Sequence, residues 1–117
     1  MENGQSSSDT YKGKVVVIVN ATSQSQAEYT TIAFQSSPNV KVIGSTTACA
    51  DGNVSSIVLP GGLNTMISGL DVFYPDGSPT QRVAVKIDYK IYPTITGIST
   101  GKDELLDKAI EVLNASW

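Results

Sequence analysis

Serine hydroxyls cluster between residues 20 and 28, where a buried strand is expected to lead into a helix. A hydroxyl at a helix N-terminus faces unpaired backbone N–H groups and the positive end of the helix dipole, which stabilise a developing oxyanion. Ser25 occupies that place, so it is a candidate nucleophile. The alternative interpretation is that Ser23 or Ser25 only caps the helix, a role that stabilises by about 1 kcal/mol.

The other reactive residue types limit the chemistry further. The 117 residues include no histidine and a single cysteine, Cys49. Neither a Ser-His-Asp triad nor a His-containing metal site can be completed within the chain, and no intrachain disulfide can form. We expect no metal or other cofactor. Cys49 has no neighbouring histidine to favour its thiolate, so we expect it to be a small buried or half-buried residue.

Composition and charge exclude some classes of function. Eight Lys and Arg residues stand against eleven Asp and Glu, giving a net charge of −3. The basic residues are dispersed, so no nucleic-acid-binding surface is predicted. No stretch is apolar enough for a membrane span, and the N-terminus does not resemble a signal peptide. We expect residues 1–10 to be a disordered leader or linker, followed by one domain.

Periodicity predicts the elements that position the serine turn. The β-branched run at 14–19 is typical of a central strand covered on both faces, and 40–43 predicts a second strand. A helix over 24–34, stopped before Pro38, would connect them as a βαβ unit.

The second half of the chain predicts strands and a closing helix. Strands are expected at 54–59, 65–74 and 83–91, separated by Pro-Gly and Asp-Gly turns. A helix over 102–114 would begin at a loose capping box, with Thr100 as the cap and Asp103 at its third position.

Several of these segments resemble one family. Residues 14–20, Lys-Val-Val-Val-Ile-Val-Asn, followed by Ser-Gln-Ser-Gln-Ala-Glu at 23–28, resemble the nucleophile segment of the C-terminal processing (tail-specific) serine peptidases, peptidase family S41. Similar matches follow at Val-Lys-Val-Ile-Gly-Ser-Thr-Thr (40–47), Leu-Pro-Gly-Gly (59–62), Tyr-Pro-Asp-Gly (74–77) and the helix from Lys102. The resemblance covers about residues 11–114, and it rests on the order and spacing of all these motifs together.

The resemblance implies a fold, an activity and roles for individual residues. The fold would be part of an α/β crotonase/ClpP-like ββα spiral, a mixed sheet with a nucleophile-bearing helix and a C-terminal helix. The activity would be serine-type endopeptidase hydrolysis of protein or peptide substrates, in the periplasm, the cell envelope or outside the cell. By motif position, Ser25 is the nucleophile and the Gln26 backbone N–H is an oxyanion donor. Ser23 is the motif's first hydroxyl, and Glu28 holds a structural hydrogen-bonding place.

The sequence also departs from the family pattern. Ala50 stands where lysine-dyad members carry their base, and residues 83–88 are a degraded form of a Gly-Ile-x-Pro-Asp motif. Asp51 is the nearest carboxylate, but without an imidazole to orient, it is better interpreted as a turn residue beside Gly52. We therefore predict that residues 11–117 are the C-terminal portion of a peptidase catalytic domain. A missing upstream part would supply the base and a second oxyanion donor, and the isolated fragment would be inactive.

Two other functions remain open at this point. The chain could be a non-catalytic peptide-binding or scaffold module, in which Ser25 only caps its helix and the strands within 54–91 accept an extended peptide by edge pairing. It could also form a homo-oligomer through an exposed sheet edge.

Overall fold

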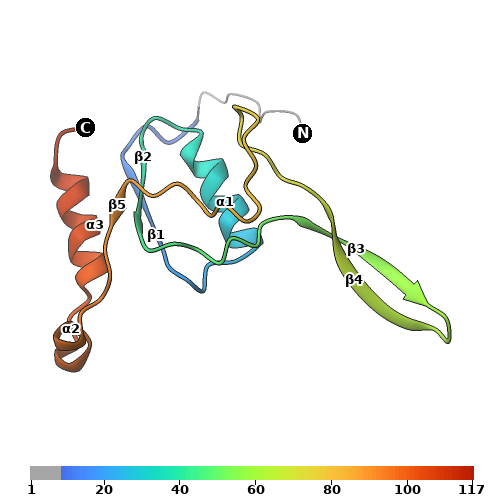
Figure 1. Ribbon diagram of the computed structural model, residues 1–117. Coiled ribbons are helices and arrows are strands. Elements are labelled where there is room, and N and C mark those ends of the chain that lie inside the picture. The colour runs from blue at the N-terminus through green and yellow to red at the C-terminus, as the bar shows by residue number, and fades with distance from the viewer. Residues whose placement is uncertain (1–8) are drawn as a thin grey trace.

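The computed structural model describes residues 9–117 (Figure 1). The elements follow in the order β1 (Val15–Val19), α1 (Gln26–Gln35), β2 (Val40–Gly44), β3 (Asn53–Leu59), β4 (Leu63–Leu70), β5 (Tyr89–Lys90), α2 (Ile95–Thr100) and α3 (Glu104–Asn114). The predicted leader, residues 1–10, lies outside the described residues except for its last two positions. No helix in the described range is long and apolar enough to cross a membrane.

The predicted βαβ unit is confirmed. β1 pairs in parallel with β2 in a continuous register from Val15↔Val40 to Val19↔Gly44, and α1 connects the two strands. Helices α1 and α3 lie on opposite sides of this sheet (Figure 1). Both parallel strands are rich in β-branched residues, which suit a sheet with helices packed on its faces.

The predicted place of the first strand within the sheet is wrong. The strand order is β1-β2-β5, so β2 is central and β1 lies at an edge. The burial pattern agrees, because Val42 and Ile43 of β2 are completely buried, whereas Ile18 of β1 is 42% exposed. A β-branched run therefore identified a strand but did not determine its position in the sheet.

The segment 83–91 forms much less strand than its alternating pattern predicts. β5 is confined to Tyr89–Lys90, paired in parallel with the end of β2. Upstream of β5, side chains take the place of strand partners: the Val85 N–H donates to the Thr47 hydroxyl, and the Lys86 N–H donates to the Tyr74 hydroxyl. The Asp88 carboxylate accepts from the Val42 N–H at 2.7 Å. These bonds satisfy the backbone without a regular ladder.

β3 and β4 form an antiparallel hairpin that projects away from the rest of the molecule (Figure 1). It is a separate two-stranded sheet, so parallel and antiparallel pairing do not share one mixed sheet. Both of its faces carry exposed apolar side chains, including Met66 at 64% exposed on one face and Leu63 at 65% exposed on the other. β4 ends at Leu70, earlier than the strand predicted over 65–74.

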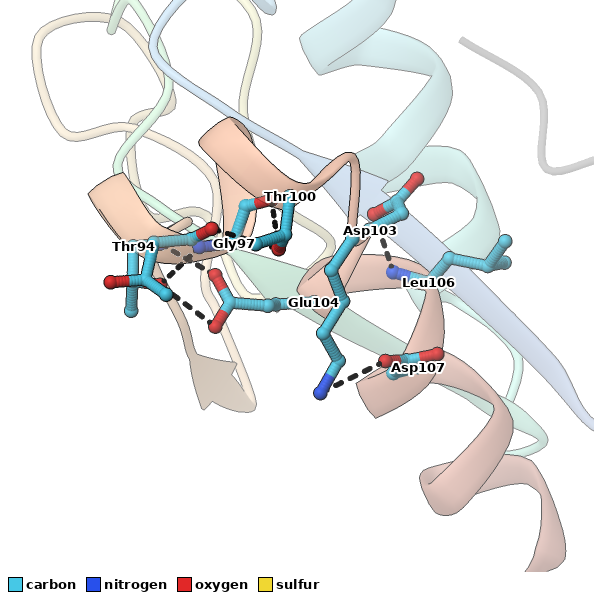
Figure 2. A network of polar contacts seen from close by, with 9 residues as sticks. Thr94, Gly97, Thr100, Asp103, Glu104, Leu106 and Asp107 are labelled. Atoms are coloured by element: carbon cyan, nitrogen blue, oxygen red, sulfur yellow. Dashed lines mark hydrogen bonds and ion pairs between the residues drawn. The ribbon is translucent and has the colours of Figure 1, made fainter.

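The chain closes with two helices, of which the sequence predicted one. Gly101, at φ 69°, ends α2 in the left-handed conformation, and Asp103 is the N-cap of α3, accepting from the Leu106 N–H at 2.9 Å. The predicted capping box at Thr100 is therefore wrong. Figure 2 shows this junction, where the Thr94 hydroxyl and backbone N–H donate to the carboxylate of Glu104.

A small apolar core lies between α1 and the parallel sheet. Its buried members come from β1, α1, β2 and the long connection before β5: Val19, Ile32, Val42, Tyr74 and Val85. α3 covers the other side of the sheet with Ala109 and Val112. The core therefore ends beneath the carboxyl end of β1, where the serine turn begins.

Candidate active site

Ser25 lies at the start of α1, on the turn that leaves the carboxyl end of β1. It is exposed, and its backbone has φ 53° and ψ −116°. L-residues rarely adopt this region, and a residue held there costs about 1–3 kcal/mol. In α/β-hydrolases the nucleophilic serine also lies on a strained, sharp turn between a strand and a helix, which exposes its hydroxyl.

The capping role that competes with catalysis is present at the same residue. Ser25 is the N-cap of α1, and the helix start has the capping-box arrangement with Glu28 as its reciprocal partner. The Ser25 backbone N–H donates to the Glu28 carboxylate at 3.1 Å. A cap and a nucleophile can be the same residue, so the capping box does not separate the two interpretations.

The backbone N–H of Gln26 is available as a donor. In the first turn of α1 the Ala27 N–H donates to the Gln24 carbonyl, and the Tyr29 N–H donates to the Ser25 carbonyl. No described group accepts a hydrogen bond from the Gln26 N–H. This N–H belongs to the first orphan turn of a ten-residue helix, where the dipole favours negative charge.

Glu28 is the most heavily bonded side chain of the site. It is 1% exposed, and its two oxygens accept from four donors: the Ser25, Cys49 and Ala50 N–H groups and the Thr47 hydroxyl. No lysine or arginine of the described chain pairs with it. All four partners are donors, as a buried carboxylate requires. Glu28 therefore joins the serine turn to the segment that follows β2.

Ser23 lies on the serine turn, and Ala50 lies on the segment that follows β2. The Ser23 hydroxyl accepts from the Asn20 N–H at 3.1 Å, and the Ser23 carbonyl accepts from the Ala48 N–H at 3.0 Å, so Ser23 shapes the turn. Ala50 contributes its backbone N–H to Glu28, and its methyl side chain offers no proton acceptor. Cys49, at φ 58°, is half-buried beside it.

An open cleft of about 420 Å³ begins at Ser25 and Gln26. Its remaining lining residues come from α1 and from the segments around the base of the hairpin: Tyr29, Asp51, Gly52, Asn53, Val54 and Val72. Reasoning from the sequence missed Tyr29, Val54 and Val72. Their place in the cleft depends on how segments far apart in the sequence pack together, and no local sequence pattern indicates that packing. The cleft gives Ser25 room for an approaching carbonyl group.

Asp51 differs from a simple exposed turn residue. It is 3% exposed, accepts from the Gly52 N–H at 2.9 Å and lies 3.0 Å from the Thr80 hydroxyl. The first contact joins Asp51 to the next residue, and neither Asp51 nor Gly52 lies in a turn. The second depends on a residue 29 positions later, and no local pattern could have predicted it.

These features can be compared with known proteins. Residues 1–91 match the model of peptidase family S41, so the chain belongs to this family. No curated protein matches the sequence. A candidate peptidase from Parabacteroides merdae is similar in structure, with a TM-score of 0.78 and 26% identity over 90% of this chain and 33% of its own.

Two further structures share the fold at lower identity. Mature CPAF complexed with lactacystin has a TM-score of 0.72 and 17% identity, over 92% of this chain and 21% of its own. A lipoprotein from Streptococcus agalactiae has a TM-score of 0.63 and 21% identity, over 86% of this chain and 34% of its own. The chain therefore spans about a fifth to a third of the length of these proteins.

Proposed function

We propose that residues 11–117 are the C-terminal portion of the catalytic domain of a serine-type endopeptidase of the C-terminal processing (tail-specific) kind. Its substrates are proteins or peptides. The observation that carries this proposal is an exposed serine held at positive φ at the N-terminus of α1, opening on a cleft. Family membership supports the same chemistry.

The proposed reaction assigns each group of the site one task. The Ser25 oxygen attacks the substrate carbonyl carbon, and the carbonyl oxygen takes up negative charge beside the Gln26 N–H. The peptide C–N bond then breaks, the amine leaves with the proton that a base took from Ser25, and water hydrolyses the acyl ester to free Ser25. Glu28 fixes the turn through the Ser25 N–H and takes no proton. Ser23 shapes the turn from its first position.

The proton of Ser25 needs an acceptor that these residues do not supply. Ala50 occupies the place of the family's lysine, and the chain has no histidine. A positioned general base contributes about 10²–10⁴-fold to the rate. We therefore assign the base to an upstream part of the same polypeptide and expect this chain alone to be inactive or nearly so.

The finer description of fold and location belongs to the same proposal. A parallel βαβ unit with its helix starting at the nucleophile, followed by a hairpin and a C-terminal helix, is compatible with part of a crotonase/ClpP-like ββα spiral. Family membership and the lipoprotein among the similar structures favour a periplasmic, cell-envelope or secreted parent protein.

A fluorophosphonate probe tests the proposal. In the polypeptide that joins this chain to its base, we expect the probe to add one adduct, detected by intact mass and located on Ser25 by peptide mapping. Ser25→Ala should abolish the adduct. Ser36→Ala, at the other end of the same helix, is the matched control and should be labelled like the wild type. A wild type that is not labelled, or a Ser25→Ala variant that is, would contradict the proposal.

The hairpin favours a second candidate, a peptide-binding or scaffold module that associates with itself. No charged residue lies between Asp51 and Asp71, and the hairpin leaves apolar side chains exposed on both faces. The radius of gyration is 17.5 Å, whereas a compact chain of this length has about 13 Å. Such an unpaired arm can add strands to a peptide or to a second copy.

Light scattering distinguishes this candidate. Self-association through the hairpin predicts a dimer or larger species that Met66→Lys converts to a monomer, because it places a charge on an exposed hairpin face. A wild-type monomer over the accessible concentration range would exclude self-association and leave peptide binding to be measured by titration.

A further inference from the structure

Asn53 lines the same cleft as Ser25 with a side chain that has no partner in the described chain. It is the first residue of β3, and it is exposed. No described residue forms a hydrogen bond with its carboxamide. A carboxamide offers two N–H donors and one carbonyl acceptor from a single side chain. Asn53 therefore presents both kinds of hydrogen-bonding group to whatever enters the cleft.

A β-bulge lies next to this residue. The pair Asn53↔Leu70 is followed by Val54↔Ser68, so Gly69 is an extra residue on β4. Bulges bend a strand, increase its twist and re-aim side chains, and they are frequent beside active sites. Successive side chains of a regular strand point to opposite faces, yet Asn53 and Val54 both line the cleft. The irregular pairing thus accompanies the placement of two consecutive residues at the site.

The cleft offers a ligand no free charge. Its one charged lining residue, Asp51, is 3% exposed. One oxygen of Asp51 accepts from the Gly52 N–H at 2.9 Å, and the other lies 3.0 Å from the Thr80 hydroxyl, so both oxygens are already bonded within the chain. No lysine or arginine lines the cleft. A ligand is therefore bound there through hydrogen bonds with neutral groups and through apolar contacts.

A peptide backbone matches these groups. Each peptide unit carries one N–H donor and one carbonyl acceptor, which is the complement of a carboxamide. Ser25 and the Gln26 N–H lie on the α1 side of the cleft, where the scissile carbonyl would bind. Asn53 lies at the base of the hairpin and lines the cleft with them, so it can contact a peptide unit next to the scissile bond. Val54 supplies an apolar surface beside it.

We propose that Asn53 is a substrate-binding residue whose carboxamide exchanges hydrogen bonds with the N–H and carbonyl of the substrate backbone beside the scissile bond. The inference rests on the proposed function, because it concerns the substrate of that reaction. Asn53 takes no part in proton transfer. It binds the main chain and not a particular side chain, so it contributes to affinity and alignment for any substrate sequence.

Two phosphonates of different size test this role in the polypeptide that joins the chain to its base. One is a fluorophosphonate without peptide units, and the other is the diphenyl phosphonate of N-acetyl-trialanine. In both reactions the Ser25 oxygen forms a bond to phosphorus, fluoride or phenoxide leaves, and the Ser25 proton passes to the base. Intact mass gives both second-order rate constants, and their ratio isolates the contribution of the peptide.

We expect Asn53→Ala to lower the ratio of the peptidyl rate to the fluorophosphonate rate about ten-fold. A merely structural role would lower both rates and leave the ratio as it is. Asn64→Ala is the matched control, because Asn64 is an exposed asparagine of β4 opposite Val58, at the far end of the hairpin. This control should keep the wild-type ratio.

A double-mutant cycle locates the contact on the backbone. Methylation of each peptide nitrogen of the trialanine probe in turn removes one N–H at a time. At the nitrogen that Asn53 binds, methylation should slow labelling of the wild type but should have little further effect on Asn53→Ala. Fully additive effects at every nitrogen would mean that Asn53 does not contact the backbone N–H groups, and they would overturn the proposal.

The outcomes distinguish the two proposals. If the fluorophosphonate labels Ser25 and the ratio is the same in Asn53→Ala and the wild type, the role of Asn53 is wrong and the peptidase proposal stands. If neither phosphonate labels Ser25, the peptidase proposal is wrong and the inference fails with it. Should Asn53→Ala fail to fold, Asn53→Asp keeps the shape of the side chain and removes its N–H donors, and the same decrease in the ratio is then required.

Discussion

Glu28→Gln is the perturbation that tests the site most directly. One oxygen of Glu28 accepts from the Thr47 hydroxyl and the Cys49 N–H, and the other accepts from the Ser25 and Ala50 N–H groups. Glutamine has the same shape but keeps only one oxygen. If the NH₂ group faces the Ser25 and Ala50 N–H groups, both of those hydrogen bonds are lost. If it faces Thr47 and Cys49, the Cys49 bond is lost, whereas the Thr47 hydroxyl can rotate and accept from the amide.

The magnitude follows from the one or two bonds that are lost. A hydrogen bond to a charged group contributes about 1.5–3 kcal/mol, so the loss amounts to about 1.5–6 kcal/mol. Removing a buried charge offsets part of this loss, because the variant no longer desolvates a carboxylate. We expect a net decrease of about 1–4 kcal/mol in the free energy of unfolding, a substantial share of the about 5–15 kcal/mol typical of a domain.

Denaturant unfolding, followed by circular dichroism and by the fluorescence of the single tryptophan, Trp117, measures this difference. Glu111→Gln is the matched control, the same substitution at an exposed position of α3 that pairs with Lys108. It should cost less than about 1 kcal/mol. If Glu28→Gln destabilises no more than Glu111→Gln, the four bonds do not hold the serine turn, and the reasoning from burial and donor count is wrong.

Two further predictions concern the backbone and pH. Gly44→Ala should lower the free energy of unfolding by about 3 kcal/mol or more, because a Cβ there would lie 1.8 Å from the Val19 carbonyl oxygen and φ is 126°. Gly61 also has a positive φ but has open space around it, so Gly61→Ala should cost only about 1 kcal/mol. Thermal unfolding of both variants measures the difference. Hydrogen bonds from the hydroxyl and N–H of Ser78 lower the pKa of Asp76 from 3.8 to about 2. A carboxyl group whose pKa is lowered in the folded state contributes stability that is fully present above its ordinary pKa of 3.8. That contribution is lost as the pH falls toward about 2. Ser78→Ala should raise that pKa in an NMR titration, and an unchanged pKa would show that Ser78 is not its cause.

Local signals in the sequence were sufficient for the first half of the fold. The β-branched run before Asn20, Pro38 after the helix and the short apolar run from Val40 each define an element through its own residues. They correctly predicted β1, α1 and β2. The centre of the sheet was assigned wrongly because strand order depends on which segment pairs later, and the alternating pattern at 83–91 could not show that side chains would replace most of its ladder.

The residues of the candidate site could be predicted from the sequence, but their hydrogen-bond partners could not. The motif marked Ser23, Ser25 and Glu28, and all three lie on the turn or first helical turn where it put them. Three of the four donors to Glu28 come from residues 19 to 22 positions away, and the Thr80 contact of Asp51 spans 29 positions. Sequence reasoning could name the carboxylates but not their partners, because those partners are set by packing of the finished fold.

The long-range bonds also explain how Ser25 can keep an unfavourable backbone conformation. Its N–H is held by Glu28, whose other oxygen accepts from the Thr47 hydroxyl, and that hydroxyl in turn accepts from the N–H of the core residue Val85. A continuous series of hydrogen bonds thus connects the serine turn to the core. Positive φ at a non-glycine residue costs about 1–3 kcal/mol. The hydrogen bonds that the Ser25 N–H and the Thr47 hydroxyl donate to the buried Glu28 carboxylate can offset this cost. The hydrogen bonds to Glu28 and Thr47 therefore stabilise the backbone of Ser25 from the side of the core, and its other side borders the open cleft.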